Sequence, residues 1–226
     1  TSTHDAATAY TSLNFAPVVT QLALAYHNSC SLTNVGSMKC WGYNGWGHIG
    51  TLASGVQTTP TNLPGYTNSI SAIAAGHHHT CALTTAGAVR CFGLNWNNNL
   101  TPGITSGAVD ISAGYLHSCA LMSYGGVKCW GRNDSGGQLG DGTNTNRIAA
   151  VDVLGLTSGV TAITTGHESS CALLSTGAVK CWGWNGYGQL GDGTTTNRNV
   201  PTQVSGITSG AVAIVAGYNH TCALLD

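Results

Sequence analysis

Charged side chains are scarce in this chain. Its 226 residues include 7 Lys and Arg and 8 Asp and Glu, which gives a formal net charge of -1. A chain this close to neutral offers no basic field for nucleic acid and no polybasic patch for a membrane surface. The charge content therefore excludes nucleic acid as an expected partner.

Long hydrophobic runs are missing as well, although 42% of the residues are hydrophobic. No run of about 18 apolar residues occurs, so the sequence predicts no membrane span. The first residue is Thr rather than Met, with no signal segment before it. We therefore expect a chain that has been processed or excerpted from a longer one.

Carboxylates are too few to indicate acid–base chemistry. Glu168 is the single Glu, and no two carboxylates are adjacent at repeat positions. General acid–base catalysis requires positioned proton donors and acceptors. We expect no enzymatic activity and no cofactor.

Glycine and cysteine, in contrast, are abundant, with 32 Gly and 9 Cys. Together with many Thr, Ser and Asn, this composition is typical of turn-rich β proteins outside the cell. Eight cysteines fall into pairs ten positions apart: Cys30 and Cys40, Cys81 and Cys91, Cys119 and Cys129, Cys171 and Cys181. A fifth copy starts at Cys222, so one small unit is repeated along the chain.

Each cysteine pair frames a predicted β-hairpin. A Gly lies six residues after the first Cys in every complete copy, which fits a three-residue hairpin loop with Gly in the left-handed conformation. Folding about that loop places the two Cys opposite each other, close enough for a disulfide. Zinc is disfavoured because each hairpin supplies only half a site. Four bridges indicate an oxidising compartment: extracellular space or the cell surface, with the periplasm as an alternative.

Four short β-prone stretches fill each period of about 50 residues, which predicts an all-β fold, a β-propeller of four-stranded blades. The 38-residue step from Cys81 to Cys119 lacks the Gly-Gln-Leu-Gly phrase, so we expect its blade to have lost or shortened the outer strand. We assign residues 1–20 to a lead-in segment and residues 21–226 to an incomplete array of about four and a half blades. Its units are anchored at Cys30, Cys81, Cys119, Cys171 and Cys222.

Three phrases of one unit carry a family resemblance. Residues 166–173 read Gly-His-Glu-Ser-Ser-Cys-Ala-Leu, residues 177–183 read Gly-Ala-Val-Lys-Cys-Trp-Gly, and residues 188–191 read Gly-Gln-Leu-Gly. They resemble the regulator of chromosome condensation repeat in its cysteine-bearing bacterial form, over about residues 20–226. The resemblance implies a β-propeller, usually of seven blades, with functions from guanine-nucleotide exchange to protein inhibition. The layout is similar to that of a β-lactamase inhibitor protein of this family, which binds its target through loops on one rim.

The sequence departs from that pattern in two ways. Four units and a fraction cannot close seven blades, so the ring is completed by missing sequence, by another chain, or not at all. No inserted wedge hairpin of the kind used by exchange factors is visible, so nucleotide exchange is not expected. The partner expected for Cys222 would lie near a position 232, outside this sequence; an odd cysteine indicates truncation, which we favour, or an intermolecular bridge.

Other local patterns could suggest a chemical site. Asn133 to Gly137 resembles a serine-protease nucleophile segment, but it aligns with an ordinary blade turn, and a triad is defined by geometry. Adjacent side chains of the triplet His77 to His79 are expected to point apart, and His79 shares a repeat position with His117 and His220, which favours structural hydrogen bonding over metal binding. The turns at Asp141 and Asp192 offer one carboxylate each, too few for calcium, and Asx turns explain them.

Variation within fixed positions predicts a binding surface. Tyr and His recur just after the strand that precedes each first Cys, and aromatic residues recur in a second variable turn. These candidate rim residues are Tyr26, His77, Tyr115, His167, Tyr218, Trp46, Trp96, Trp184 and Tyr187. Equivalent turns of successive blades share one rim, and rigid aromatic groups are good anchors for protein partners. Packing within the protein is the competing interpretation, which we adopt only for Trp41, Trp130 and Trp182.

Two function hypotheses follow. The first is a secreted or cell-surface structural and protein-interaction scaffold that binds protein partners or self-assembles within a larger extracellular assembly. The alternative is an enzyme-inhibitor or ligand-binding propeller, with carbohydrate as one candidate ligand for the aromatic rim. Low charge and the missing catalytic groups favour the first hypothesis, although fold alone does not assign function.

Overall fold

The computed structural model describes residues 16–51, 55–63, 65–94 and 102–226, and the all-β prediction is confirmed there. The strands are β1 (Val19–Leu24), β2 (Asn28–Thr33), β3 (Met38–Tyr43), β4 (Val56–Asn62), β5 (Ile70–Ala75), β6 (His79–Thr84), β7 (Val89–Gly93), β8 (Ala108–Ala113), β9 (His117–Met122), β10 (Val127–Gly131), β11 (Arg147–Asp152), β12 (Val160–Thr165), β13 (Ser169–Leu174), β14 (Val179–Gly183), β15 (Arg198–Gln203), β16 (Ala211–Ala216) and β17 (Thr221–Leu225).

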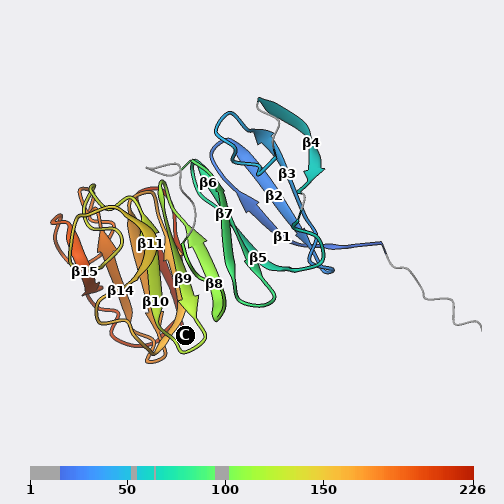
Figure 1. Cartoon of the computed structure of the whole chain (residues 1–226). Helices are drawn as coiled ribbons and strands as arrows, with labels where there is room; N and C mark the ends of the chain where they lie inside the picture. Colours follow the sequence, from blue (N-terminus) through green and yellow to red (C-terminus); the bar gives the residue numbers. More distant parts are fainter. Residues whose placement is uncertain (1–15, 52–54, 64, 95–101) are drawn as a thin grey trace, which may run out of the picture.

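These strands form a series of antiparallel sheets that follow one another as propeller blades (Figure 1). Three sheets have four strands, β1 to β4, β8 to β11 and β12 to β15, whereas β16 and β17 form a two-stranded sheet. The first strand of each blade packs beside its counterparts, so β1, β5, β8, β12 and β16 make the inner wall. The expected partial propeller is therefore confirmed; a seven-bladed ring stays a prediction.

The second blade is the exception that the sequence predicted. Within the described residues its sheet has three strands, β5, β6 and β7, with no outer strand. Asn97, Asn98 and Asn99, on which that prediction partly depended, lie outside the described residues. β1 begins at Val19, so the array starts two residues inside the lead-in segment expected from the sequence. No helix in the described residues is long and apolar enough to span a membrane.

Each complete repeat contains the predicted hairpin and its disulfide. The cysteines of each pair face one another in the strand register, as in Cys171 opposite Cys181, with Cα atoms 4.0 to 4.1 Å apart in the four bridges. Gly177 has φ +77° at its hairpin loop, and its equivalents also lie in the left-handed region, where L side chains are strained. Cys222 is the free, exposed cysteine among the described residues.

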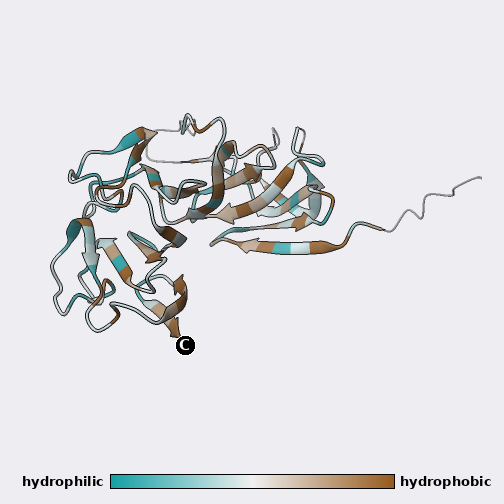
Figure 2. Cartoon of the chain, turned by 90° about the horizontal axis from the view of Figure 1, so that it is seen from below, coloured by the Kyte–Doolittle hydropathy of each residue, from teal (hydrophilic) through white to brown (hydrophobic). Residues whose placement is uncertain are grey.

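One aromatic ring from each of the second, third and fourth blades fills a socket in the blade before it. Trp182 of the fourth blade is fully buried against Leu139, Val153 and Leu156 of the third. Its indole Nε1 donates a hydrogen bond of 2.9 Å to the carbonyl oxygen of Gln138. Trp130 and Phe92 pack against apolar residues of the second and first blades without such a hydrogen bond. Apolar segments accordingly run along the strands, and hydrophilic ones along many connecting loops (Figure 2).

The prediction that Trp41 belongs to the core is only half right. Its counterparts Trp130 and Trp182 are 1% and 0% exposed, whereas Trp41 is half-buried. Trp41 belongs to the first described blade, so no described blade precedes it to provide a socket. Burial at this position therefore depends on a neighbouring blade and not on the hairpin alone.

Glycines bring successive blades into backbone contact at the inner wall. A Cβ atom on Gly76 would lie 2.4 Å from the carbonyl oxygen of Gly114, and one on Gly114 would lie 2.5 Å from that of Gly166. Gly166 stands in the same relation to Gly217, at 2.8 Å. A methyl group cannot occupy these positions without moving backbone, so close packing around the wall requires glycine.

Candidate functional site

The five candidate residues that follow the inner strands form one continuous band of rings. We call Tyr26, His77, Tyr115, His167 and Tyr218 the rim band. Tyr26 stacks on His77 with ring centroids 4.3 Å apart, and the distances along the rest of the band are 4.8, 4.2 and 4.0 Å. The band crosses all five described blades, because each residue occupies the same turn of its own blade.

Backbone hydrogen bonds between blades hold the rim band in place. The amide of His77 donates to the carbonyl of Gly114, at 3.1 Å, and the amide of Tyr115 donates to that of His167, at 2.9 Å. An open cavity of about 260 Å³ is lined by the rim band together with Ala and Gly residues at the ends of the inner strands. The rings therefore sit on rigid backbone, while Tyr26 and Tyr218 remain 69% and 56% exposed.

The rim band is electrically neutral at pH 7. Burial lowers the pKa of His77, and the nearby His27 and His167 lower it further. Burial also lowers the pKa of His167, an effect that Glu168 opposes from 3.9 Å. Imidazoles with lowered pKa are uncharged near neutrality. A partner of this surface would meet aromatic rings rather than a charged patch.

One acidic group adjoins the rim band, and sequence reasoning did not identify it as part of the surface. Glu168 Oε1 accepts hydrogen bonds from Ser135 Oγ at 2.7 Å and from Arg132 at 3.2 Å. Arg132 in turn donates to Asp134 at 2.6 Å. Ser135, which lies in the protease-like segment, thus donates to a neighbouring blade. The signal in the sequence was Glu168 itself, the only Glu in the chain.

A second group of aromatic rings joins the rim band at the first two blades. Trp46 packs edge-on to His78 with centroids 4.6 Å apart, and His78 lies 4.2 Å from His77. His48 lies 5.3 Å from Trp46 and is fully buried. Burial, together with neighbouring imidazoles, lowers the pKa of His48 and of His78 to about 4. Sequence reasoning missed His48, which stands where other repeats have Gln.

The expectation that neighbouring side chains of the His triplet point apart was wrong for two of the three. His77 Nδ1 and His78 Nε2 are 2.9 Å apart in the bend that follows β5, so the two side chains turn toward each other there. His79 begins β6 and points into the core, where its Nε2 lies 2.6 Å from Ser118 Oγ. His117 contacts Ser170 Oγ in the same way at 3.0 Å, whereas His220 is exposed. Within the described residues, no group of three or more His, Cys, Asp or Glu could hold a metal.

The remaining aromatic candidates are placed separately. Trp184 and Tyr187 contact each other edge-on, with centroids 5.1 Å apart, in the turn that follows β14. Tyr187 is 72% exposed and Trp184 is half-buried. Trp96 lies outside the described residues. The structure thus joins six of the nine candidates, the rim band and Trp46, and leaves Trp184 and Tyr187 as a separate pair.

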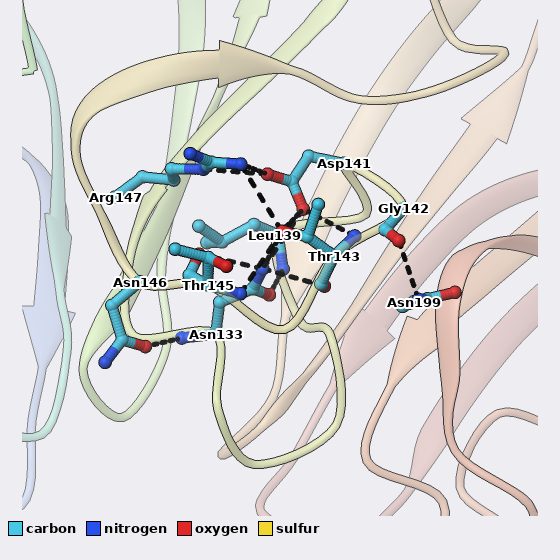
Figure 3. Close-up of polar contacts among 9 residues, drawn as sticks. All are labelled: Asn133, Leu139, Asp141, Gly142, Thr143, Thr145, Asn146, Arg147 and Asn199. Atoms are coloured by element: carbon cyan, nitrogen blue, oxygen red, sulfur yellow. Dashed lines mark hydrogen bonds and ion pairs between the residues drawn. The ribbon is translucent and has the colours of Figure 1, made fainter.

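Internal hydrogen bonds fix both Gly-Asp-Gly-Thr turns, and Figure 3 shows the one at Asp141. Asp141 Oδ1 accepts from the backbone amide of Thr143 at 3.0 Å, as expected for an Asx turn, and its Oδ2 pairs with Arg147 at 2.8 Å. Asn133 fills the centre of the loop and donates to the carbonyls of Thr143 and Thr145. The next blade repeats the arrangement around Asp192. Both carboxylate oxygens are thus used within the loop, in agreement with the Asx-turn interpretation.

Comparison with known proteins identifies the repeat. Two models described as the regulator of chromosome condensation (RCC1) repeat match this chain, one at residues 36–83 and 176–224, the other at residues 70–99, 108–136 and 160–189. Together these segments span more than half of the chain. The chain belongs to the RCC1 repeat family. A curated relative, the probable E3 ubiquitin-protein ligase HERC4 of Rattus norvegicus, is 31% identical over 208 residues, which is 83% of this chain but 19% of that ligase.

Several solved structures share the fold. Human WBSCR16 superposes with a TM-score of 0.81 at 22% identity, covering 94% of this chain and 59% of that one. Yeast RCC1 (Prp20), solved with Kap60 bound, gives 0.75 at 18% identity, covering 90% and 53%. The CRINKLY WD40 ectodomain of the Arabidopsis thaliana receptor kinase ACR4 gives 0.56 at 19% identity, covering 93% and 62%. At these identities the likeness concerns the fold alone, and the chain spans less than two thirds of each.

Proposed function

We propose that this chain is part of a non-catalytic protein-interaction scaffold, secreted or exposed at a cell surface. The continuous rim band across five blades is the observation that carries the proposal. Aromatic rings on fixed backbone bury a large area on binding and lose little side-chain entropy, so they make strong anchors for a protein partner. The neutral imidazoles add no charge that a partner would have to compensate.

The disulfides and two of the structural neighbours support the assignment. Bridges in four successive repeats are typical of proteins that fold in an oxidising compartment. Among the proteins of similar fold, ACR4 provides an ectodomain and yeast RCC1 a complex with a protein, Kap60. These likenesses concern the fold, so the partner of the present chain has to be found by experiment.

The experiment places a photoreactive benzoylphenylalanine at Tyr218 or at Tyr124 and irradiates each protein in material from its native source. Tyr124 is the matched control, since it is 55% exposed against 56% for Tyr218 but lies in the hairpin loop between β9 and β10. We expect one protein partner to crosslink from position 218 and none from position 124.

Affinity for that partner provides the second measurement. Tyr26→Ala and Tyr218→Ala should each weaken binding at least tenfold, because truncating an interface Tyr commonly costs about 2 kcal/mol. Tyr124→Ala should change it less than twofold. Equal effects at all three positions would contradict a binding role for the rim band.

Carbohydrate is the second candidate ligand, and one cleft favours it. The side chains of Asp134, Ser135, Asn144, Asn197 and Asn199 line a strongly polar hollow of about 270 Å³ between the third and fourth blades. Amide and carboxylate groups are suited to hydrogen bonds with sugar hydroxyls. Binding to a glycan array without any protein crosslink from position 218 would favour this candidate over the first.

A further inference from the structure

Three imidazoles meet where the first blade contacts the second, and we call His48, His77 and His78 the imidazole cluster. His48 follows β3 of the first blade, whereas His77 and His78 lie in the bend after β5 of the second. The ring centroids of His77 and His78 are 4.2 Å apart, and those of His48 and His78 are 5.9 Å apart. Trp46 contacts both blades here, with its ring 5.3 Å from His48 and 4.6 Å from His78. Because His77 also belongs to the rim band, the cluster connects that band to the first blade.

Neighbouring side chains provide no negative charge for the imidazole cluster. The titratable groups that face it in the described part of the chain are Tyr26, His27, Tyr43, His79, Tyr115 and His167. Glu168 and Arg132, which are of opposite charge, both act on His167. Residues 52–54, 64 and 95–101, the internal segments outside the description, contain no ionisable side chain. A proton taken up by the cluster would therefore have no adjacent carboxylate to balance it.

The contact between His77 and His78 requires that at least one of the two facing nitrogens lacks a hydrogen. His77 Nδ1 lies 2.9 Å from His78 Nε2, so one nitrogen donates and the other accepts. A protonated imidazole carries a hydrogen on both nitrogens, so two charged rings would turn two donors toward each other. The contact therefore breaks when both rings are protonated.

Burial restricts His48 in a related way. Its side chain is fully buried, and neither of its ring nitrogens has a hydrogen-bond partner among the described residues. A buried charge without a hydrogen-bonding partner is costly. Protonation of His48 therefore requires that the ring leave its present position and reach water.

The pKa values agree with this geometry. Burial, together with neighbouring imidazoles, lowers the pKa of His48 and of His78 from 6.5 to about 4, and the same causes lower the pKa of His77. A state in which the rings separate and reach water takes up protons at higher pH, so acid favours separation. For one histidine with pKa values of about 4 and 6.5 in the two states, the ratio of separated to joined molecules rises about 25-fold from neutral pH to pH 5.

We propose that the imidazole cluster is an acid-sensitive switch of the rim band. Near neutral pH its rings join the first blade to the second, and the band is continuous. In acid the protonated rings separate, Trp46 moves away from His78, and the stacking of Tyr26 on His77 is lost. Histidine is suited to this role because it changes charge in mild acid. The further consequence, release of a protein partner in acid, rests on the proposed function.

Other repeats of the chain supply a variant that should fold. Gln138 and Gln189 occupy the repeat position of His48, and Leu116 occupies that of His78. The double variant His48→Gln/His78→Leu therefore removes two imidazoles and introduces only side chains that this fold already carries at those positions.

The first experiment follows Trp46 by fluorine NMR in protein that contains 5-fluorotryptophan, and Trp46→Phe identifies its resonance. Trp184 is the internal control, because its contact with Tyr187 lies at the corresponding turn of the fourth blade, where Gln189 replaces the imidazole of His48.

We expect the Trp46 resonance to shift with a midpoint between about pH 4 and 6.5, while far-UV circular dichroism stays constant. The shift should be absent from the double variant, and Trp184 should show no transition in this range. A Trp46 resonance that does not titrate, or that titrates equally in the double variant, would overturn the switch.

The second experiment measures release of the partner that crosslinks from position 218. Its affinity for the wild-type chain should fall by about tenfold or more between neutral pH and pH 5, and by less than about threefold for the double variant. Equal losses of affinity would overturn release by the imidazole cluster and leave the binding role of the rim band intact. If no partner crosslinks, the proposed function fails, whereas the Trp46 resonance still decides whether the cluster switches.

Discussion

At the residue scale, His117 shows how the fold restricts titration. This side chain is 1% exposed, and its Nε2 lies 3.0 Å from Ser170 Oγ of the next blade. Burial lowers its pKa from 6.5 to about 3, with His79 and His167 adding to the effect. The unfolded chain therefore takes up a proton at higher pH than the folded one. The contribution of His117 to the free energy of unfolding is therefore complete above about pH 6.5 and is lost as the pH falls toward 3.

Replacement of His117 tests this linkage. His117→Gln keeps a polar group near Ser170 but removes the titration, so the slope of unfolding free energy against pH should fall by about 1.4 kcal/mol per pH unit between pH 6 and 4. Denaturant titrations at several pH values measure the slope. An unchanged slope in the His117→Gln variant would contradict the argument.

At the element scale, each hairpin depends on one glycine for two separate reasons. Gly177 has φ +77°, and a Cβ there would also lie 2.5 Å from the backbone nitrogen of Gly210. Gly206 has the same φ of +77° but nothing within 4 Å of its Cβ position. The two positions share the conformational strain and differ only in the steric clash.

Replacing each glycine with alanine separates the conformational strain from the steric clash. Gly206→Ala should lower the free energy of unfolding by about 1 kcal/mol, the strain of a left-handed non-glycine residue. Gly177→Ala should cost at least about 1 kcal/mol more, because backbone between two blades must move. Thermal or denaturant unfolding measures the free energy of unfolding of both variants. Equal decreases would mean that the backbone at Gly210 moves away from the new Cβ without a loss of stability.

At the scale of the whole molecule, stability should be graded along the array. A repeat protein is stabilised by each unit and by its contacts with neighbouring units. Every residue of β9 in the third blade is buried, whereas β1 and β17 are largely exposed. Hydrogen–deuterium exchange should therefore show slowest amide exchange in β9 and β13, and fastest exchange in β1, β16 and β17. Uniform protection would indicate that the blades unfold as one cooperative unit.

Much of the fold could be predicted from the sequence because its signals are local. The spacing of Cys171 and Cys181, with Gly177 between them, fixes a hairpin without reference to any other blade. The half-burial of Trp41 could not be predicted, since it depends on what packs beside the first blade.

The candidate site was predictable in position but not in detail. Tyr26 and Tyr218 occupy equivalent turns, so their common rim followed from the repeat. The contact between His77 and His78 did not, because the sequence places both residues in a turn but does not show how their side chains are oriented there. His48 was missed because its burial arises from rings of two blades that come together only in the folded chain.

The glycines of the inner wall have a geometric consequence. Contact of Gly76, Gly114 and Gly166 with the carbonyl of the following blade sets how far each blade turns relative to the one before it. The curvature of the arc therefore depends on these three glycines, because each has a hydrogen atom where any other residue would place a carbon. The first copy has Ala25 instead of glycine, so the step from the first blade to the second cannot repeat a contact that leaves no room for a Cβ atom.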